Sequence, residues 1–214
     1  MPDPAPDYAY DVFISYERDG LTTGWITEHF LPLFRTWLRQ EVRDVCGRAA
    51  KPIFFDKSKT DPDFPTNLKQ ELAGIEPGAN WDDSLKHAIR VSCCMVGIWN
   101  PPYFDSHWCN IEWKSFDQRA DTTGRRVLLA ANFHDGRSFP AKAAARQPID
   151  LSPYALFGPA LRNSRKYEDF QTTVQFLARQ VALAIQDAPP FAAWPIVDQI
   201  GPLQPPPPVP LPRL

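Results

Sequence analysis

The sequence predicts an α/β fold, a five-stranded parallel sheet flanked by helices, on the strength of two observations. Short apolar runs alternate along the chain with amphipathic stretches, which is the pattern of strands linked by helices in a parallel sheet. Two of the runs, YDVFISY at Tyr10–Tyr16 and SCCMVGIW at Ser92–Trp99, are apolar at almost every position. Such runs are typical of central strands that are covered on both faces.

A helix is expected after the first strand. Apolar residues recur every four positions from Phe30 to Val42, which is the spacing of one helical face. Pro32 fits such a helix only in its opening turn, where no backbone N–H is needed. Residues 52–56, PIFFD, then predict the second strand.

The second strand and the next helix are separated by a long polar connection at residues 57–78, which also carries prolines. Asn80 can cap the helix that follows, because its side chain can accept from backbone N–H groups of the first turn. Trp81, Leu85 and Ile89 lie on one face of that helix, so it is expected to pack against the sheet.

The second half of the chain continues the alternation. Residues 106–118 predict a third helix, and residues 125–132, RRVLLAAN, predict a fourth strand. The fifth strand, around Ile149, is expected at an edge of the sheet because Pro148 cannot donate to a ladder. Apolar residues at helical spacing over 170–185 predict a long final helix.

Proline marks the boundaries of the folded part. Residues 1–8 are expected to be disordered, residues 9–187 to form the domain, and residues 188–214 to form a proline-rich, solvated tail. Ten of the 24 prolines fall within 189–212, and each removes a backbone donor and fixes φ. The PxxP pattern in this tail leaves two roles open, a passive end or a ligand for proline-recognising modules.

Composition excludes several functions. The net charge of −2 does not suit a nucleic-acid binder or a protein attached to an anionic membrane surface. No signal-peptide pattern and no apolar run of about 20 residues occurs, so a cytoplasmic location is expected. No CxxC pair occurs and the histidines are scattered, so no metal is expected. Without GxGxxG after a strand or GxxxxGK[ST], dehydrogenases and P-loop NTPases are disfavoured.

The stretch after the third strand, WNPPYFDSHWCNIEWKSF, holds the candidate chemistry. Trp108 and Glu112 are four residues apart and therefore lie side by side on one face of the expected helix. The loop before them starts at the carboxyl end of a strand, where parallel sheets bind ligands. An indole beside a carboxylate suits a flat cationic ring attached to a sugar. A solvated Glu112 and a Trp108 that only packs are the alternatives, since Glu is rarely buried.

Three blocks resemble the Toll/interleukin-1 receptor (TIR) domain family. They are YDVFISY, PGANWDDSLKHAI at residues 77–89, and SHWCNIE at residues 106–112, in the family's order and on its expected strand, loop and helix positions. The resemblance covers residues 10–187 and implies the TIR form of a flavodoxin-like parallel sheet. It also implies self-association through the loop after the second strand.

In the NAD⁺-cleaving, bacterial-type members, the resemblance implies cleavage of the nicotinamide–ribose bond. The catalytic glutamate corresponds to Glu112, and the preceding aromatic residue corresponds to Trp108. Residues at the end of the first strand and just after it, Ser15, Glu17, Arg18 and Asp19, are expected to help hold the substrate. Gly78 and Trp81 are expected in the same role, although Trp81 also begins a packed helical face.

The resemblance leaves alternatives open. NAD⁺ would be a substrate and not a cofactor, and the product can be ADP-ribose, a cyclic variant or a conjugate. An enzyme of this type acts in signalling or in antiviral and cell-death defence, with a separate sensor or effector protein as partner. The other reading is a non-catalytic adaptor that works through TIR–TIR association.

Overall fold

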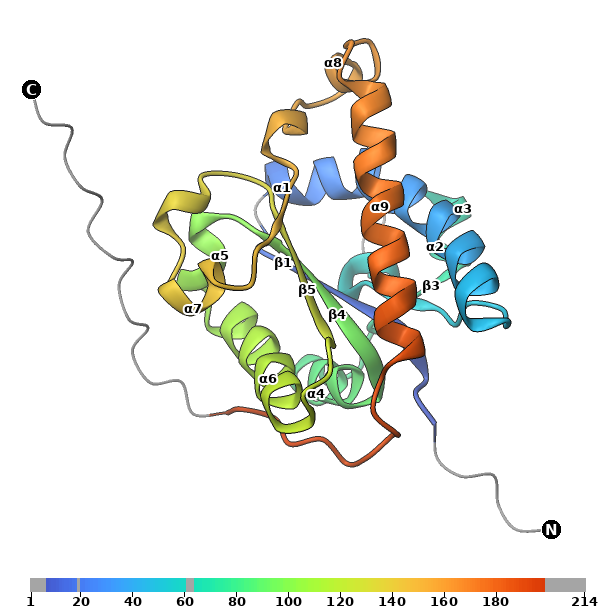
Figure 1. The fold of residues 1–214 in the computed structure, drawn as a ribbon, viewed down its shortest axis with the longest axis vertical. Coiled ribbons are helices and arrows are strands. Elements are labelled where there is room, and N and C mark those ends of the chain that lie inside the picture. The colour runs from blue at the N-terminus through green and yellow to red at the C-terminus, as the bar shows by residue number, and fades with distance from the viewer. Residues whose placement is uncertain (1–6, 19, 61–63, 199–214) are drawn as a thin grey trace, which may run out of the picture.

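The computed structural model describes residues 7–18, 20–60 and 64–198. Its centre is one parallel sheet with the strand order β3-β2-β1-β4-β5-β6. The strands are β1 (Tyr10–Tyr16), β2 (Ile53–Phe54), β3 (Leu72–Ala73), β4 (Ser92–Trp99), β5 (Leu128–Asn132) and β6 (Ile149–Asp150). The α/β class and the parallel sheet are therefore confirmed, with one strand more than expected (Figure 1).

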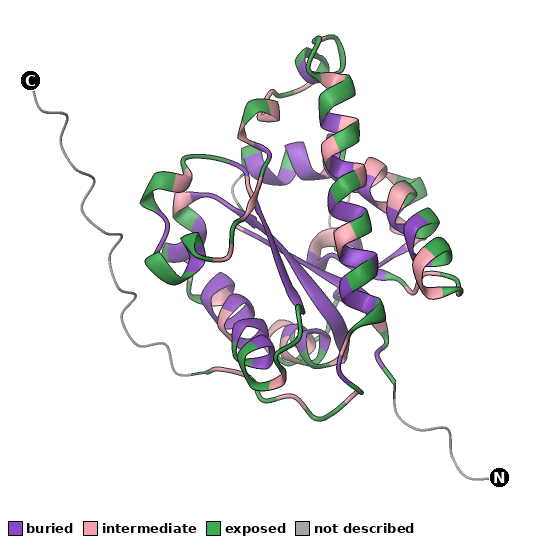
Figure 2. Ribbon diagram, in the orientation of Figure 1, coloured by how far each residue is buried: buried purple, intermediate pink, exposed green. Residues whose placement is uncertain are grey.

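Helices cover both faces of the sheet. The α-helices are α1 (Gly20–Trp25), α2 (Leu31–Cys46), α3 (Thr66–Lys69), α4 (Trp81–Val91), α5 (Pro101–Asp105), α6 (His107–Thr123), α7 (Ala141–Ala144), α8 (Pro159–Arg162) and α9 (Tyr167–Gln186). The pair α2 and α9 packs together on one side, and α4 and α6 lie on the other (Figure 1). The sheet between them is buried along almost its whole length (Figure 2).

The two central strands form as the sequence predicts. β1 and β4 pair in parallel, with Val12 opposite Cys94 and Ser15 opposite Gly97. Every residue of β4 is buried, as expected for a strand without a solvent face. Because both strands run in one direction, their carboxyl ends, at Tyr16 and Trp99, meet at the same edge of the sheet.

The expectation of five strands is wrong because β3 forms within the connection 57–78. β3 pairs with β2 through Leu72 and Ala73 opposite Ile53 and Phe54. Leu72 and Ala73 lie between Glu71 and Gly74, so the sequence contains no apolar run of strand length here. Pairing with β2 nevertheless buries Leu72 to 3% exposure, and this burial favours the edge strand.

The first helix begins earlier than expected. Backbone helix runs from Gly20 to Cys46, so Pro32 lies inside a longer helical stretch. The five residues Ile26–Phe30 form a wider π-helical turn directly before α2. A proline lacks the N–H of a regular helical bond and crowds the preceding turn. A wider turn at this point accommodates both effects, so the helix continues through the proline.

Packing contacts extend beyond residues 8 and 188, where the boundaries of the domain are expected. Tyr8 is 7% exposed and its hydroxyl donates to the Pro189 carbonyl at 3.1 Å. Trp194 Nε1 donates to Tyr8 Oη at 3.0 Å, and the Val197 amide donates to Ser115 Oγ at 3.0 Å. Aromatic and aliphatic side chains between the prolines pack against the domain. The free energy gained by this packing exceeds what the segment loses because its prolines cannot form ladder hydrogen bonds. Residues 1–6 and 199–214, which belong to the predicted termini, lie outside the described residues.

Candidate active site

Glu112 is buried at the carboxyl edge of the sheet, with 6% exposure. The Ser15 hydroxyl, at the end of β1, donates to Glu112 Oε2 at 2.5 Å. Tyr103 Oη lies 2.6 Å from Ser15 Oγ, so three side chains from β1, α5 and α6 form one hydrogen-bonded chain. Glu112 therefore does not lie on the solvated face where most glutamates are found.

Burial sets the ionisation of Glu112. Removal from water disfavours the carboxylate and is the largest contribution to a pKa of about 8; nearby Asp56 and Glu17 raise the pKa further. The Ser15 hydrogen bond and the Arg18 charge act in the opposite direction. At pH 7 the group is therefore mostly protonated, with a minority of carboxylate available.

Two helix caps hold the Glu112 chain in place. Asn100 Oδ1 accepts from the Tyr103 amide at 3.0 Å and so starts α5, whose first turn holds Pro101 and Pro102. Ser106 then ends α5, and its hydroxyl accepts from the Cys109 amide at the start of α6. These caps orient Tyr103 and Glu112 towards β1.

A second group of side chains includes Arg18 and Asp56, which line the same cavity as Glu112. The Arg18 guanidinium stacks over the Trp81 indole, with Cζ 4.3 Å from the ring centroid. The Trp81 and Trp108 rings meet edge to face, with centroids 4.6 Å apart. Arg18 also forms an ion pair with Asp56, which is 7% exposed and accepts from Tyr16 Oη at 2.8 Å. One cation thus links an indole stack to a buried carboxylate.

The site is closed in this structure. A cavity beside Glu112 offers about 10 Å³, roughly the space of one water molecule. It is lined by Phe13, Ile14, Tyr16, Arg18, Asp56 and Glu112. A pocket for a small molecule is typically about 300–1,000 Å³ in volume, so a dinucleotide can enter only after these side chains move.

Five of the six predicted site residues are brought into this region. Ser15 and Glu112 are hydrogen-bonded, and Arg18, Trp81 and Trp108 form the stack. Both hydrogen bonds of the Ser15 hydroxyl are made within the protein, and its role in substrate binding stays a prediction.

Gly78, the sixth residue, has a backbone role in this structure. Its φ is +84°, and the Ala79 amide donates to the Glu76 carbonyl at 3.1 Å. With Pro77 at the second turn position and glycine at the third, this is a type II turn, which requires the positive φ. The turn brings the chain into Asn80 and Trp81. Of the other two polar residues after the first strand, Asp19 lies outside the described residues and Glu17 approaches the Cys109 thiol at 3.6 Å.

Sequence reasoning missed Tyr103 and Asp56 as parts of the site. Asp56 ends the PIFFD run, and Tyr103 follows the third strand by four residues. Both therefore follow strands whose carboxyl ends meet at one edge, and this positional rule could have identified them.

The chain has a larger cavity elsewhere. It measures about 660 Å³ and is lined by residues of α6 and α7 together with Pro140 and Val197, but by none of the predicted site residues. Within residues 7–18, 20–60 and 64–198, no group of three or more His, Cys, Asp or Glu side chains is arranged to hold a metal ion. The helices of these same segments include none that is both long and apolar enough to cross a membrane.

Comparison with known proteins gives one family match. The model of the TIR domain family matches residues 64–161, which include Trp108 and Glu112 but begin after Ser15 and Arg18. No curated protein matches the chain. Among solved structures, the chain is similar to the TIR domain of the Toll-related receptor TRR-2 from Hydra magnipapillata, at 13% identity and a TM-score of 0.41. That similarity covers 77% of this chain and 98% of the other.

The matched region starts ahead of the turn at Gly78 and extends beyond α6, so it contains two of the three blocks that carry the resemblance in the sequence. The NAD⁺-cleaving subtype is a finer assignment than this match makes. Over residues 64–161, the chain is similar to the TIR domain family.

Proposed function

We propose that this chain is an NAD⁺ glycohydrolase of the TIR type, with Glu112 as its catalytic carboxylate. The observation that carries this proposal is the burial of Glu112 at the carboxyl edge of the sheet. It is hydrogen-bonded to Ser15 and shares its cavity with Arg18, whose guanidinium stacks on Trp81. An adaptor that works only through association needs neither a buried carboxylate nor a raised pKa, and such groups cluster at functional sites.

Cleavage of the nicotinamide–ribose bond requires few catalytic groups. Nicotinamide leaves as a neutral molecule from a pyridinium, so no strong general acid is required. The transition state resembles an oxocarbenium ion, and the ionised form of Glu112 can stabilise it or orient the ribose hydroxyls. With a pKa of about 8, the carboxylate fraction and therefore the rate are expected to rise as the pH increases from 7 to 8.

Arg18 supports the choice of a cationic ring as ligand. Its guanidinium lies 4.3 Å from the centroid of the Trp81 ring, so this indole face already attracts a planar cation. The pyridinium of NAD⁺ is also planar and cationic. Substrate entry would move Arg18 away from Trp81, and self-association through the loop between β2 and α4 would be one source of that movement.

The decisive comparison uses two buried carboxylates. Glu112→Gln keeps the shape of the side chain and removes its charge, so it should abolish NAD⁺ loss measured by chromatography. Glu41→Gln is the matched control, since Glu41 is also 6% exposed but pairs with Arg179 between α2 and α9. This control should retain most of the turnover.

Two outcomes would contradict the proposal. Equal turnover by wild type and Glu112→Gln would remove Glu112 from the mechanism. No turnover at any protein concentration, with or without a crowding agent, would favour the adaptor.

The wider role follows from the same proposal. A TIR enzyme that consumes NAD⁺ would act in signalling or in cell-death and antiviral defence, in the cytoplasm and together with a separate sensor or effector. Mass spectrometry of the nucleotide product distinguishes ADP-ribose, a cyclic variant and a conjugate, because water, the substrate itself and another nucleophile give products of different mass.

A further inference from the structure

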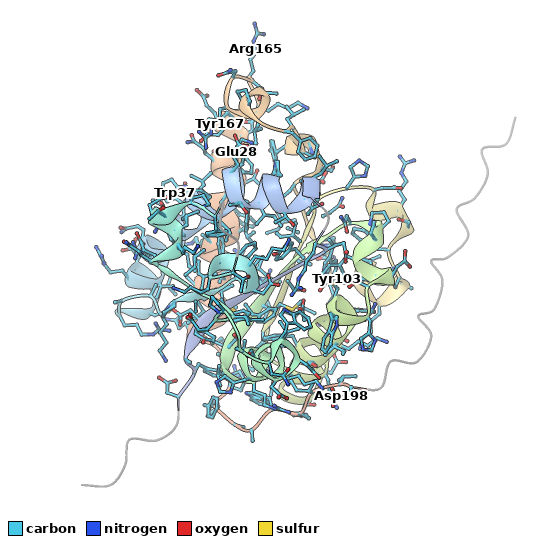
Figure 3. All side chains as sticks on the ribbon, turned by 180° about the vertical axis from the view of Figure 1, so that it is seen from behind. Glu28, Trp37, Tyr103, Arg165, Tyr167 and Asp198 are labelled. Atoms are coloured by element: carbon cyan, nitrogen blue, oxygen red, sulfur yellow. The ribbon has the colours of Figure 1, made fainter. Side chains whose placement is uncertain are left out.

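The hydroxyl of Tyr103 lies within hydrogen-bond distance of Ser15, the residue that donates to Glu112. Tyr103 is fully buried at 0% exposure, and Figure 3 shows it in the interior of the molecule, in contrast to Arg165 at the tip. Its ring packs against Trp99 and Phe104, at centroid distances of 6.2 and 5.1 Å. These contacts fix the ring, and its hydroxyl lies 2.6 Å from Ser15 Oγ.

The direction of the two hydrogen bonds follows from counting protons. A serine hydroxyl has one hydrogen, and an ionised carboxylate can only accept. When Glu112 is ionised, the Ser15 hydrogen is used at Glu112 Oε2, so Tyr103 must donate to Ser15. Burial raises the pKa of Tyr103 well above its ordinary value, so its hydroxyl keeps this proton.

We propose that Tyr103 is a positioning residue for Glu112, acting through Ser15 to hold the hydroxyl donor that stabilises the carboxylate. Tyr103 itself touches no substrate in this account. The inference rests on the proposed function for its catalytic consequence, but its structural consequence is measurable on Glu112 without any turnover.

Other charged and titratable groups also face Glu112 and bear on its ionisation. They come from β1 and the residues after it, from the turn that follows β2, and from α6 itself: Tyr16, Glu17, Arg18, Asp56 and Cys109. None of these is altered by Tyr103→Phe, which removes one hydroxyl and keeps the ring. The substitution therefore isolates the hydrogen bond to Ser15.

The test reads the ionisation of Glu112 directly. The carboxyl stretch of Glu112 is identified by infrared difference between the full chain and Glu112→Gln, and followed between about pH 6 and 10. Tyr103→Phe should move the titration to higher pH by up to about one unit, a tenfold smaller ionised fraction at neutral pH. The matched control is Tyr8→Phe, which removes a buried hydroxyl at the opposite end of β1 and should leave the titration unchanged.

The NAD⁺ assay supplies the second readout. Tyr103→Phe should lower kcat at neutral pH by about threefold to tenfold, with little change in KM and recovery at alkaline pH. An unshifted Glu112 titration in Tyr103→Phe would overturn the proposal, as would an equal loss of kcat at every pH. If no variant turns over NAD⁺, the proposed function fails, and the infrared titration still decides whether Tyr103 controls Glu112.

Discussion

Burial of Glu112 has an energetic consequence at the scale of a single residue. Its pKa in the folded chain, about 8, lies far above the value near 4.3 of a solvated glutamate. Between these two values the unfolded chain releases the proton and the folded chain keeps it, so stability decreases as the pH rises. The stability associated with neutral Glu112 is fully present below about pH 4.3 and is lost as the pH rises through about 8.

Glu112→Gln should therefore stabilise the protein in a pH-dependent way. Glutamine is uncharged at every pH. The Tm of Glu112→Gln should therefore exceed that of the wild type by a small amount near pH 5 and by about 5 °C near pH 8. Thermal unfolding of both proteins across this range measures the effect. A difference in Tm that is the same at pH 5 and pH 8 would show that Glu112 is not held in its neutral form by burial.

At the scale of elements, the turn before α4 depends on one backbone angle. Gly78 has φ +84°, and a Cβ added there would meet no atom within 4 Å. Gly24, within α1, has the same open space without a positive φ, which makes it a matched control. Gly78→Ala should lower the free energy of unfolding by about 1 kcal/mol, whereas Gly24→Ala should raise it by about 0.5 kcal/mol. Urea unfolding of the two variants tests the pair, and the same sign for both would contradict the turn assignment.

The elements differ in how far the sequence predicts them. β1 and β4 are long apolar runs between polar stretches, and α9 repeats its apolar positions over 20 residues, so periodicity alone identifies them. β3 has two residues and becomes a strand only through pairing with β2. The segment 188–198 is rich in proline, which predicts solvation, and its packing depends on Trp194 meeting Tyr8 across the whole chain.

In the site, too, some contacts are predictable from local sequence and others depend on the tertiary fold. Trp108 and Glu112 are predictable as neighbours because helical geometry places residues four apart side by side. Ser15 and Glu112 are 97 positions apart, so their hydrogen bond follows from the strand order and from the caps that start α5 and α6. The stack of Arg18 on Trp81 likewise joins the ends of two elements, and no local pattern contains it.

At the scale of the whole molecule, the last described segment ties the two ends of the domain together. Trp194 donates to Tyr8 Oη, and its ring lies 5.0 Å from Cζ of the buried Arg119. Arg119 donates in turn to the carbonyls of Ile89 and Ser92, at the junction of α4 and β4. The segment is thus part of the fold and contributes to its stability.

Removing the Trp194 ring should therefore destabilise the domain. Trp194→Ala should lower the free energy of unfolding by about 2 kcal/mol, because it removes packing against the core, a cation–π contact and a hydrogen bond. Phe176→Ala, at a ring on α9 that is 53% exposed, should change it by less than about 0.5 kcal/mol. Denaturant unfolding monitored by circular dichroism provides the values. Equal effects would mean that residues 188–198 do not stabilise the domain.

The central claim is that Glu112 meets the ribose of NAD⁺ while the nicotinamide ring lies against the indoles. Its most direct test is an experimental structure of Glu112→Gln with NAD⁺, which this variant should bind without cleaving. We expect that Arg18 has left the Trp81 face, that the nicotinamide ring lies against Trp81 or Trp108, and that the ribose is within hydrogen-bond distance of residue 112. A dinucleotide bound elsewhere, for example in the cavity between α6 and α7, would contradict it.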